Sequence, residues 1–200
     1  MTGYIKKLTN KPMKRLPLYL FLILFTLQTP SLADDIRDFQ IEGMSIGDSL
    51  LDYFTEEEIL ANKPNWFKNN EYSIANDLYS ENFETYIIVQ AAYKTKDKKY
   101  ILEGLEGYKF FDNIKECFKI QDNIINELNV LFKNLNKSKK KTLEHPAPDN
   151  KSIITNISYY FENDDKVMVG CVDREDKTAD LRVILRAKNY GYFIDNKAYK

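Results

Sequence analysis

Residues 113–135 read NIKECFKIQDNIINELNVLFKNL, and this stretch decides the fold. Its apolar side chains recur at intervals of three and four residues, which places them along one stripe of a helix. The opposite stripe carries both acidic and basic residues. The pattern therefore predicts a long amphipathic helix over 113–135, capped by Asp112 and packed across a sheet. A helix lying on a membrane surface is the weaker interpretation, because the polar stripe is not basic.

The chain after this helix predicts a sheet. A polar loop is expected over 136–151, after which the apolar period changes from 3.6 to two residues. Alternation predicts strands over 153–162, 166–173 and 180–188, joined by short polar turns as a three-strand antiparallel meander. Facing strands then present one apolar face made of Val167, Val169, Cys171, Leu181, Val183, Leu185 and Ala187. The opposite face of the last strand carries Arg182, Arg186 and Lys188.

The chain before the helix predicts a hairpin. Strands are expected over 85–94 and 100–110, with the polar turn Lys96–Lys99 between them. Gly104 and Gly107 lie three residues apart in the second strand. Glycines inside a strand often mark a bulge or a close approach of another group.

Two short helices are expected near the start of the domain. The first opens within Gly43–Asp48, with an apolar stripe formed by Ile46, Leu50, Leu51 and Phe54. The second follows the capping box Thr55–Glu58 and runs to about Ala61. The predicted fold class is α+β: an antiparallel sheet of four to five strands (hairpin plus three-strand meander), one long helix packed on one face, and two short N-terminal helices.

Residues 1–33 predict a cleavable signal peptide. Five basic residues precede the apolar run Leu16–Leu27, and Ser31-Leu-Ala33 follows it. Cleavage is expected after Ala33, leaving residues 34–200 as a single exported domain, periplasmic or secreted. The run is shorter than the roughly 20 residues that span a bilayer, so an uncleaved anchor is the alternative. Membrane contact is expected only through this segment, if it is retained.

Charge and cysteine content narrow the function classes. Without residues 1–33 the chain has 24 basic and 30 acidic residues, a net charge of −6. That balance argues against non-specific nucleic-acid binding, which depends on neutralising phosphates. An even number of cysteines in an exported domain favours a disulfide between Cys117 and Cys171. Two buried free thiols are the alternative, and the absence of a C-x-x-C motif argues against a redox-active pair.

Acidic and histidine side chains are the first candidates for chemistry. His145 is the single histidine and follows a lysine run, so a solvated loop residue is preferred over a catalytic one. A second group, at a predicted hairpin tip, offers oxygen ligands for Ca²⁺: Asp173, Glu175, Asp176 and Asp180. Arg174 and Lys177 interrupt it, so an exposed charged turn is preferred. Glu56–Glu58 are explained by the helix dipole.

Two further stretches are candidate binding surfaces. The basic run Lys137–Lys141 is interpreted as a solvated loop, with contact to an anionic lipid or polymer as the alternative. The aromatic-rich stretch Trp66–Tyr86 is interpreted as packing, with a ligand groove as the alternative. No catalytic residue, cofactor site or metal site is assigned.

Three segments carry a resemblance. Ile41–Phe54, together with Val167–Asp173 and Asp180–Val183, resembles a group of small exported bacterial proteins with no assigned activity. Gly43–Phe54 is also faintly similar to the helix starts of small envelope-assembly lipoproteins, although this chain lacks a Cys for lipid attachment. Neither resemblance implies functional residues. We expect a non-catalytic exported module that binds a protein or an envelope component; the alternatives are a small hydrolase-like enzyme and the same domain on an uncleaved anchor.

Overall fold

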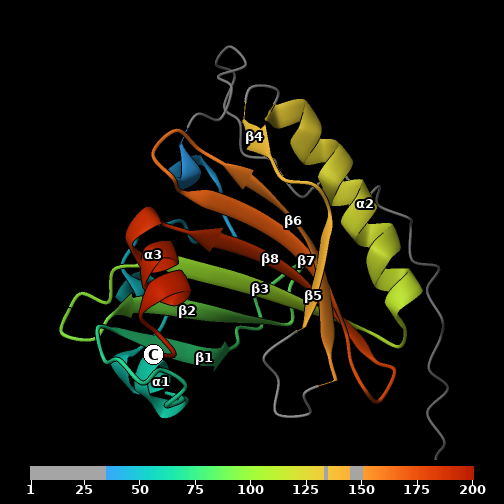
Figure 1. Cartoon of the computed structure of the whole chain (residues 1–200). Coiled ribbons are helices and arrows are strands. Elements are labelled where there is room, and N and C mark those ends of the chain that lie inside the picture. Colours follow the sequence, from blue (N-terminus) through green and yellow to red (C-terminus); the bar gives the residue numbers. More distant parts are fainter. Residues whose placement is uncertain (1–34, 133–134, 145–150) are drawn as a thin grey trace, which may run out of the picture. The chain divides into compact units, whose positions relative to one another are not determined.

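The structure is a computed structural model, and it describes residues 35–132, 135–144 and 151–200. The predicted signal segment and His145 lie outside these residues. One antiparallel sheet dominates the described chain (Figure 1). Its main path runs β1 (Tyr72–Leu78), β2 (Ile88–Lys94), β3 (Gly104–Phe111), β8 (Ala179–Arg186), β7 (Lys166–Asp173), β6 (Ile153–Tyr160) and β4 (Asn136–Lys137), and β5 (Lys141–Glu144) also pairs with β6. The α+β class is therefore confirmed.

The expected count of four to five strands is too low, since the sheet has eight. The missed strands are β1, β4 and β5. β1 lies in the aromatic stretch, where a bulge between Ala75 and Leu78 interrupts the pairing with β2. β4 and β5 lie in the expected polar loop; all their residues are exposed, and both form by pairing with β6.

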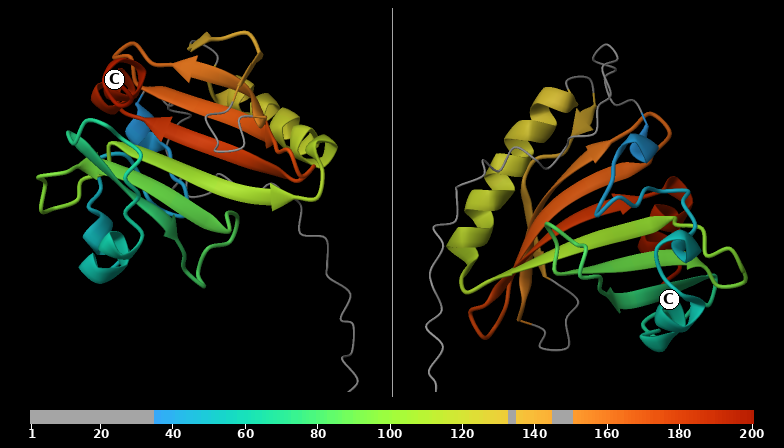
Figure 2. Two further views of the ribbon diagram at one scale, coloured as in Figure 1. Left: turned by 60° about the horizontal axis from the view of Figure 1, so that its bottom comes forward. Right: turned by 180° about the vertical axis from the view of Figure 1, so that it is seen from behind.

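The long helix is α2 (Ile114–Leu131). Asn113, rather than Asp112, caps it through hydrogen bonds from the backbone N–H groups of Lys115 and Glu116. The helix ends four residues earlier than expected, at Leu131, and β4 begins at Asn136. α2 lies along β7, β8 and β3, and Figure 2 shows it crossing the twisted sheet.

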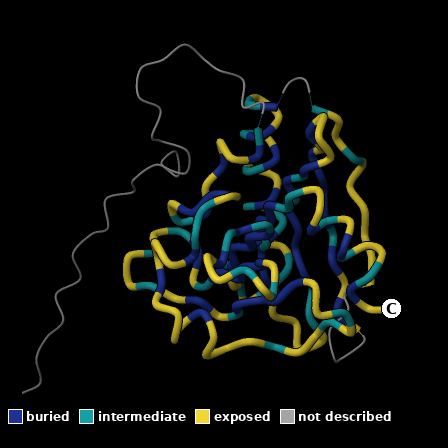
Figure 3. Tube along the Cα trace, turned by 90° about the vertical axis from the view of Figure 1, so that its left-hand side faces the viewer, coloured by how far each residue is buried: buried dark blue, intermediate teal, exposed yellow. Residues whose placement is uncertain are grey.

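The register of the strands defines two faces. Cys171, Val169 and Val167 of β7 stand opposite Leu181, Val183 and Leu185 of β8. We call this side the α2 face, because Cys117 of α2 is joined to Cys171 by a disulfide with a Cα–Cα distance of 6.0 Å. The expected pairing of the two cysteines is thus present. Figure 3 shows the buried residues concentrated at the centre of the domain.

The opposite side of the sheet carries charged residues of three neighbouring strands, and we call it the polar face. Its members are Gln90 of β2, Glu106 and Tyr108 of β3, Asp180, Arg182 and Arg186 of β8, and Lys166 of β7. α3 (Lys188–Asn196) follows β8 directly and was not expected from the sequence. Tyr190 and Phe193 of α3 are buried in a small cluster with Tyr72, Ala92 and Ala198.

The two glycines of β3 mark close approaches rather than a bulge, since the pairing of β3 with both neighbours is regular. A Cβ at Gly104 would lie 2.4 Å from the ring of Tyr190. A Cβ at Gly107 would lie 2.7 Å from the ring of Tyr86. Because side chains alternate along a strand, one glycine admits α3 on the polar face and the other admits Tyr86 on the α2 face.

The first expected helix is wrong. Glu42, Gly43 and Gly47 all have positive φ angles, of 51°, 81° and 97°, which a right-handed helix excludes. Only the short 3₁₀ turn η3 (Leu50–Asp52) forms. The second expected helix is confirmed as α1 (Glu56–Ala61), with the capping box between Thr55 and Glu58 in place.

Glu42 anchors the chain segment that precedes α1. Its carboxylate accepts the backbone N–H groups of Glu84, Thr85 and Tyr86 at 2.8, 2.9 and 2.7 Å. Phe39 then packs on Phe132 just after α2, with ring centroids 4.7 Å apart. The segment therefore packs on the same side of the sheet as α2, and the polar face lies on the opposite side.

Candidate functional site

A buried carboxylate organises one end of the polar face. Asp180 is fully buried and accepts hydrogen bonds on both oxygens. Arg174 donates to Oδ2 from Nε at 2.8 Å and lies 2.6 Å from it through a terminal nitrogen. Arg182 donates to Oδ1 from Nε at 2.6 Å. Charge-assisted hydrogen bonds of this kind offset the cost of burying the carboxylate and fix both guanidinium groups.

The centre of the polar face is a chain of hydrogen bonds around Tyr108. The Arg182 guanidinium lies over the Tyr108 ring, 4.9 Å from its centroid. The phenol oxygen is 2.9 Å from Glu106 Oε2, to which it donates, and 3.3 Å from Gln90 Oε1. Burial, followed by the charge of Glu106, raises the pKa of Tyr108 well above its usual value. The phenol therefore stays protonated and acts as a donor.

The other end of the polar face carries two cations on neighbouring strands. Lys166 of β7 and Arg186 of β8 are direct cross-strand partners, so their side chains leave the same face. Arg186 reaches Glu106 Oε1 at 3.3 Å, and Lys166 reaches Asp195 Oδ2 of α3 at 3.9 Å. Burial, followed by the charge of Arg186, lowers the pKa of Lys166. Each side chain keeps 15% of its surface exposed, so both cations are largely buried but retain some contact with solvent.

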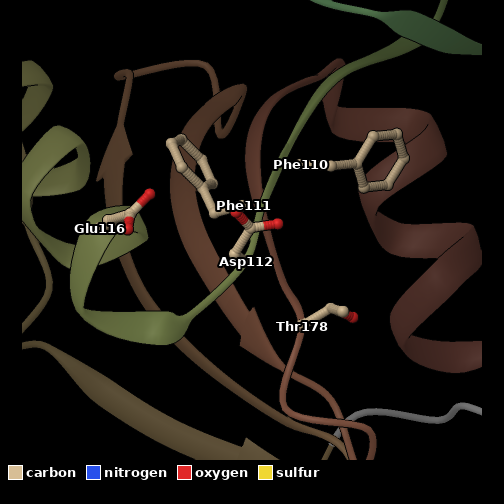
Figure 4. Close-up of a pocket in the computed structure, with 5 residues that line it drawn as sticks. All are labelled: Phe110, Phe111, Asp112, Glu116 and Thr178. Carbon is tan, nitrogen blue, oxygen red and sulfur yellow. The ribbon is translucent and has the colours of Figure 1, made fainter.

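A cavity of about 420 Å³ lies outside the polar-face network, where β3 meets α2. Phe110, Phe111, Asp112, Glu116 and Thr178 line it, and Figure 4 shows Asp112 lying between Phe111 and Thr178. Glu116 accepts a hydrogen bond from the side chain of Asn113 at 2.7 Å, so it belongs to the helix cap. The two acids of the cavity, Asp112 and Glu116, lie at the N-terminus of α2, where the helix dipole favours negative charge without any ligand.

The acids expected at the last hairpin do not converge. Asp180 is held between Arg174 and Arg182, and Glu175 pairs with Lys151. Asp176 accepts from Thr178 within the turn. In the described ranges no group of three His, Cys, Asp or Glu side chains is placed to hold a metal ion. The interpretation as an exposed turn is also wrong for Asp180, which is the most buried acid of the polar face.

The other predicted surfaces are occupied by local contacts. Lys137 bonds to Asn129 of α2, and Lys140 pairs with Asp122 of the same helix. Glu58 serves the α1 cap, and Glu56 accepts the hydroxyl of Tyr100. In the aromatic stretch Phe67 packs on Phe193, as the packing interpretation expects, while Trp66 keeps half its surface exposed.

No protein-family model and no curated protein matches this chain. Among the described residues, no helix has both the length and the apolar character needed to cross a bilayer.

Sequence reasoning missed most of the polar-face network. The expected placement of Arg182 and Arg186 opposite the apolar face of their strand is correct, but they carried no site prediction. The expected strand is two residues too long, because β8 ends at Arg186 and Lys188 begins α3. Glu106 and Tyr108 stood unremarked inside a strand interrupted by glycines. A usable signal was present: Glu106 and Tyr108 share the period-two alternation of their strand with Gly104. The alternation does not tell which strand pairs with this one, so it could not predict that Arg182 and Arg186 lie beside Glu106 and Tyr108.

Proposed function

We propose that this chain is a non-catalytic binding module, delivered by export, which receives its ligand on the polar face of the sheet. The observation that carries the proposal is the depth of the charged groups there. The side chains of Glu106, Arg182 and Arg186 are only 10, 12 and 15% exposed. Burying charges costs free energy, whereas an antiparallel sheet is stable with one polar face in water. Recognition of a ligand is a better reason than scaffolding for keeping charges at this depth.

The state of the buried groups favours binding over catalysis. A general base needs a carboxylate or imidazole that is free to accept a proton. Asp180 is bound by two arginines, and Glu106 is bound by Tyr108 and Arg186. The phenol of Tyr108 keeps its proton because its pKa is raised by burial and by Glu106. These groups offer fixed donors and a cation–π surface, which are means of recognition.

A hydrolase-like enzyme remains the second proposal, and its site would be the cavity beside Asp112 and Glu116. It is the weaker of the two, since the helix dipole favours acids at both positions and Glu116 already bonds to the cap residue Asn113. Membership in a group of small exported bacterial proteins is likewise a proposal.

Export is supported by the pattern of residues 1–33 and by the Cys117–Cys171 disulfide, because disulfides persist in oxidising compartments. The intact mass of the exported protein tests it. We expect a chain that begins at Asp34 and gains the mass of two hydrogens on reduction. A mass that retains residues 1–33 would instead favour the same domain on an uncleaved anchor.

The ligand surface is tested by mapping amide chemical shifts during titration with small carboxylates, phosphates, amines, neutral sugars and soluble envelope fragments. We expect at least one ligand class to shift the amide signals of Tyr108 in β3 and Arg182 in β8. Arg182→Gln or Tyr108→Phe should weaken the binding of that ligand. Arg37→Gln is the matched control, because Arg37 is largely exposed and pairs only with its neighbour Asp35. Shifts confined to Phe110–Glu116 would favour the enzyme proposal and overturn this one.

A further inference from the structure

The two ends of the polar face differ in how their cations are satisfied. At one end Arg174 and Arg182 both donate from Nε to the oxygens of Asp180, at 2.8 and 2.6 Å. At the other end Arg186 and Lys166 stand side by side, and like charges on directly opposed strand residues repel one another. At the first end a buried carboxylate bridges the two cations, whereas no carboxylate of the described residues bridges Arg186 and Lys166.

The acids around Arg186 and Lys166 do not fill this position. Glu106 gives one oxygen to Tyr108 and meets Arg186 only at 3.3 Å with the other. Asp195 is 3.9 Å from Lys166, and its side chain is 62% exposed. Asp165 is buried but already accepts from the Lys188 backbone and the Asn163 side chain. The nearby carboxylates are therefore shared, distant or committed elsewhere.

The Arg186 guanidinium also has an unused donor. Its Nε is buried and finds no hydrogen-bond acceptor among residues 35–132, 135–144 and 151–200. A buried donor without a partner costs free energy, and a charged one costs more. Arg186 nevertheless keeps part of its surface open, as does Lys166. An oxyanion is the kind of group that could satisfy both neighbouring cations and the unpartnered Nε–H of Arg186.

We propose that Arg186 and Lys166 form a seat for an oxyanion, a carboxylate or phosphate carried by the ligand, in the role that Asp180 plays for Arg174 and Arg182. The inference rests on the polar face being the ligand surface and names the chemical group that this end binds. Arg supplies a planar pair of donors and Lys a point charge, a combination suited to either anion.

The test uses the side-chain Nε–Hε signals of the arginines in ¹⁵N-labelled protein. The chain has five arginines, so these signals are few. Sodium phosphate and sodium acetate are titrated in turn at constant ionic strength against sodium chloride. We expect a saturable shift of the Arg186 signal with at least one of them, and no shift of the exposed Arg37 signal. The stronger probe identifies the oxyanion as phosphate or carboxylate.

Two variants separate the seat from a general charge effect. Arg186→Gln and Lys166→Gln should each lower the affinity for the anion by about tenfold or more, because each removes one charge-assisted contact. Lys166→Arg should retain binding. If Arg186→Gln does not fold, Lys166→Gln alone decides the matter, since it leaves the Arg186 signal observable.

The outcomes distinguish this inference from the proposed function. An Arg186 shift that chloride reproduces, backbone amide shifts limited to Lys137–Lys141, or unchanged affinity in Lys166→Gln overturns the oxyanion seat. If another ligand class perturbs Tyr108 and Arg182 while neither anion moves Arg186, the seat fails and the binding surface stands. If no class perturbs the polar face, both fail.

Discussion

β8 is buried on both of its faces, but by different kinds of interaction. Toward α2 the strand presents Leu181, Val183 and Leu185, which are buried with little need for exact orientation. Away from α2 it presents Asp180, Arg182 and Arg186, which tolerate burial only through specific partners at specific distances. The α2 face is held by apolar area and one covalent link, whereas the polar face combines matched charges with the buried side chains of Ile184 and Val172.

The comparison shows that the two faces should differ in how well they tolerate the loss of one contact. Apolar contacts are non-directional, so the α2 face can lose one partner and keep its fold while becoming less stable. Paired buried charges are less forgiving, because the loss of one leaves the other in low dielectric without compensation. The following variants test this division, starting with the largest expected effect.

The disulfide is expected to contribute most. Replacing Cys117 and Cys171 together by Ala should lower the free energy of unfolding by about 4 kcal/mol, since the link spans 54 residues and restricts the unfolded chain. Urea unfolding at neutral pH measures it. Reductant should shift the midpoint of the unmodified protein and leave that of the double variant alone. Equal midpoints for both proteins would mean that the α2 face relies on packing only.

A core leucine of α2 tests the packing on the same face. Leu128→Ala should cost roughly 2–5 kcal/mol, as expected for a buried leucine that leaves a cavity. Val130 lies two residues further on the same helix and is 64% exposed, so Val130→Ala serves as the control. The control should change stability by less than about 0.5 kcal/mol. Similar losses in the two variants would contradict the placement of the helix.

The polar face is broken by Asp180→Asn. Removing the carboxylate leaves Arg174 and Arg182 without their shared counter-charge and should cost about 2–3 kcal/mol, less than a fully buried pair because Arg174 is one-third exposed. Asp164→Asn is the control: Asp164 pairs with Lys188 at the surface, and Asn tolerates its positive φ angle. The control should leave the unfolding midpoint unchanged. An Asp180→Asn variant as stable as the parent would show that the charges are not coupled.

The smallest effect appears only in alkali. Burial raises the pKa of Tyr159, on the α2 face, from 10.0 to about 12. The unfolded chain ionises first, so this contribution is intact below pH 10 and lost as the pH rises toward about 12. Chemical unfolding measured between pH 8 and 12 should show this decline, and Tyr159→Phe should reduce it. A decline that is the same in the variant would assign it to other tyrosines.

Much of the architecture was predictable because its signals are local. The periodicity of Ile114–Leu131 and the alternation of Lys166–Asp173 each lie within one element. The strand forms where expected, and the helix differs from the expectation in its cap and in its earlier end. Cys117 and Cys171 fell on the stripes that face each other, so their pairing followed from the same two patterns.

The missed elements share the absence of a local signal. α3 has no side-chain cap and contains Gly191, and it is positioned by Tyr190 and Phe193 packing into their cluster. β5 is exposed at every residue and exists because β6 pairs with it. Neither α3 nor β5 can be predicted from a window of a few residues, since each depends on packing or pairing with residues that are distant in the sequence.

The amino-acid sequence by itself determined the α+β class, the long helix and the meander, and it favoured the pairing of the cysteines, because periodicity and side-chain chemistry are encoded within each segment. Only the tertiary structure decided the polar face. Glu106 and Arg186 are 80 residues apart and meet because β3 pairs with β8 in one register, and Arg186 meets Lys166 through the register of β7. A slip of one residue would turn these side chains to the other face, so the site depends on strand pairing that no single segment specifies.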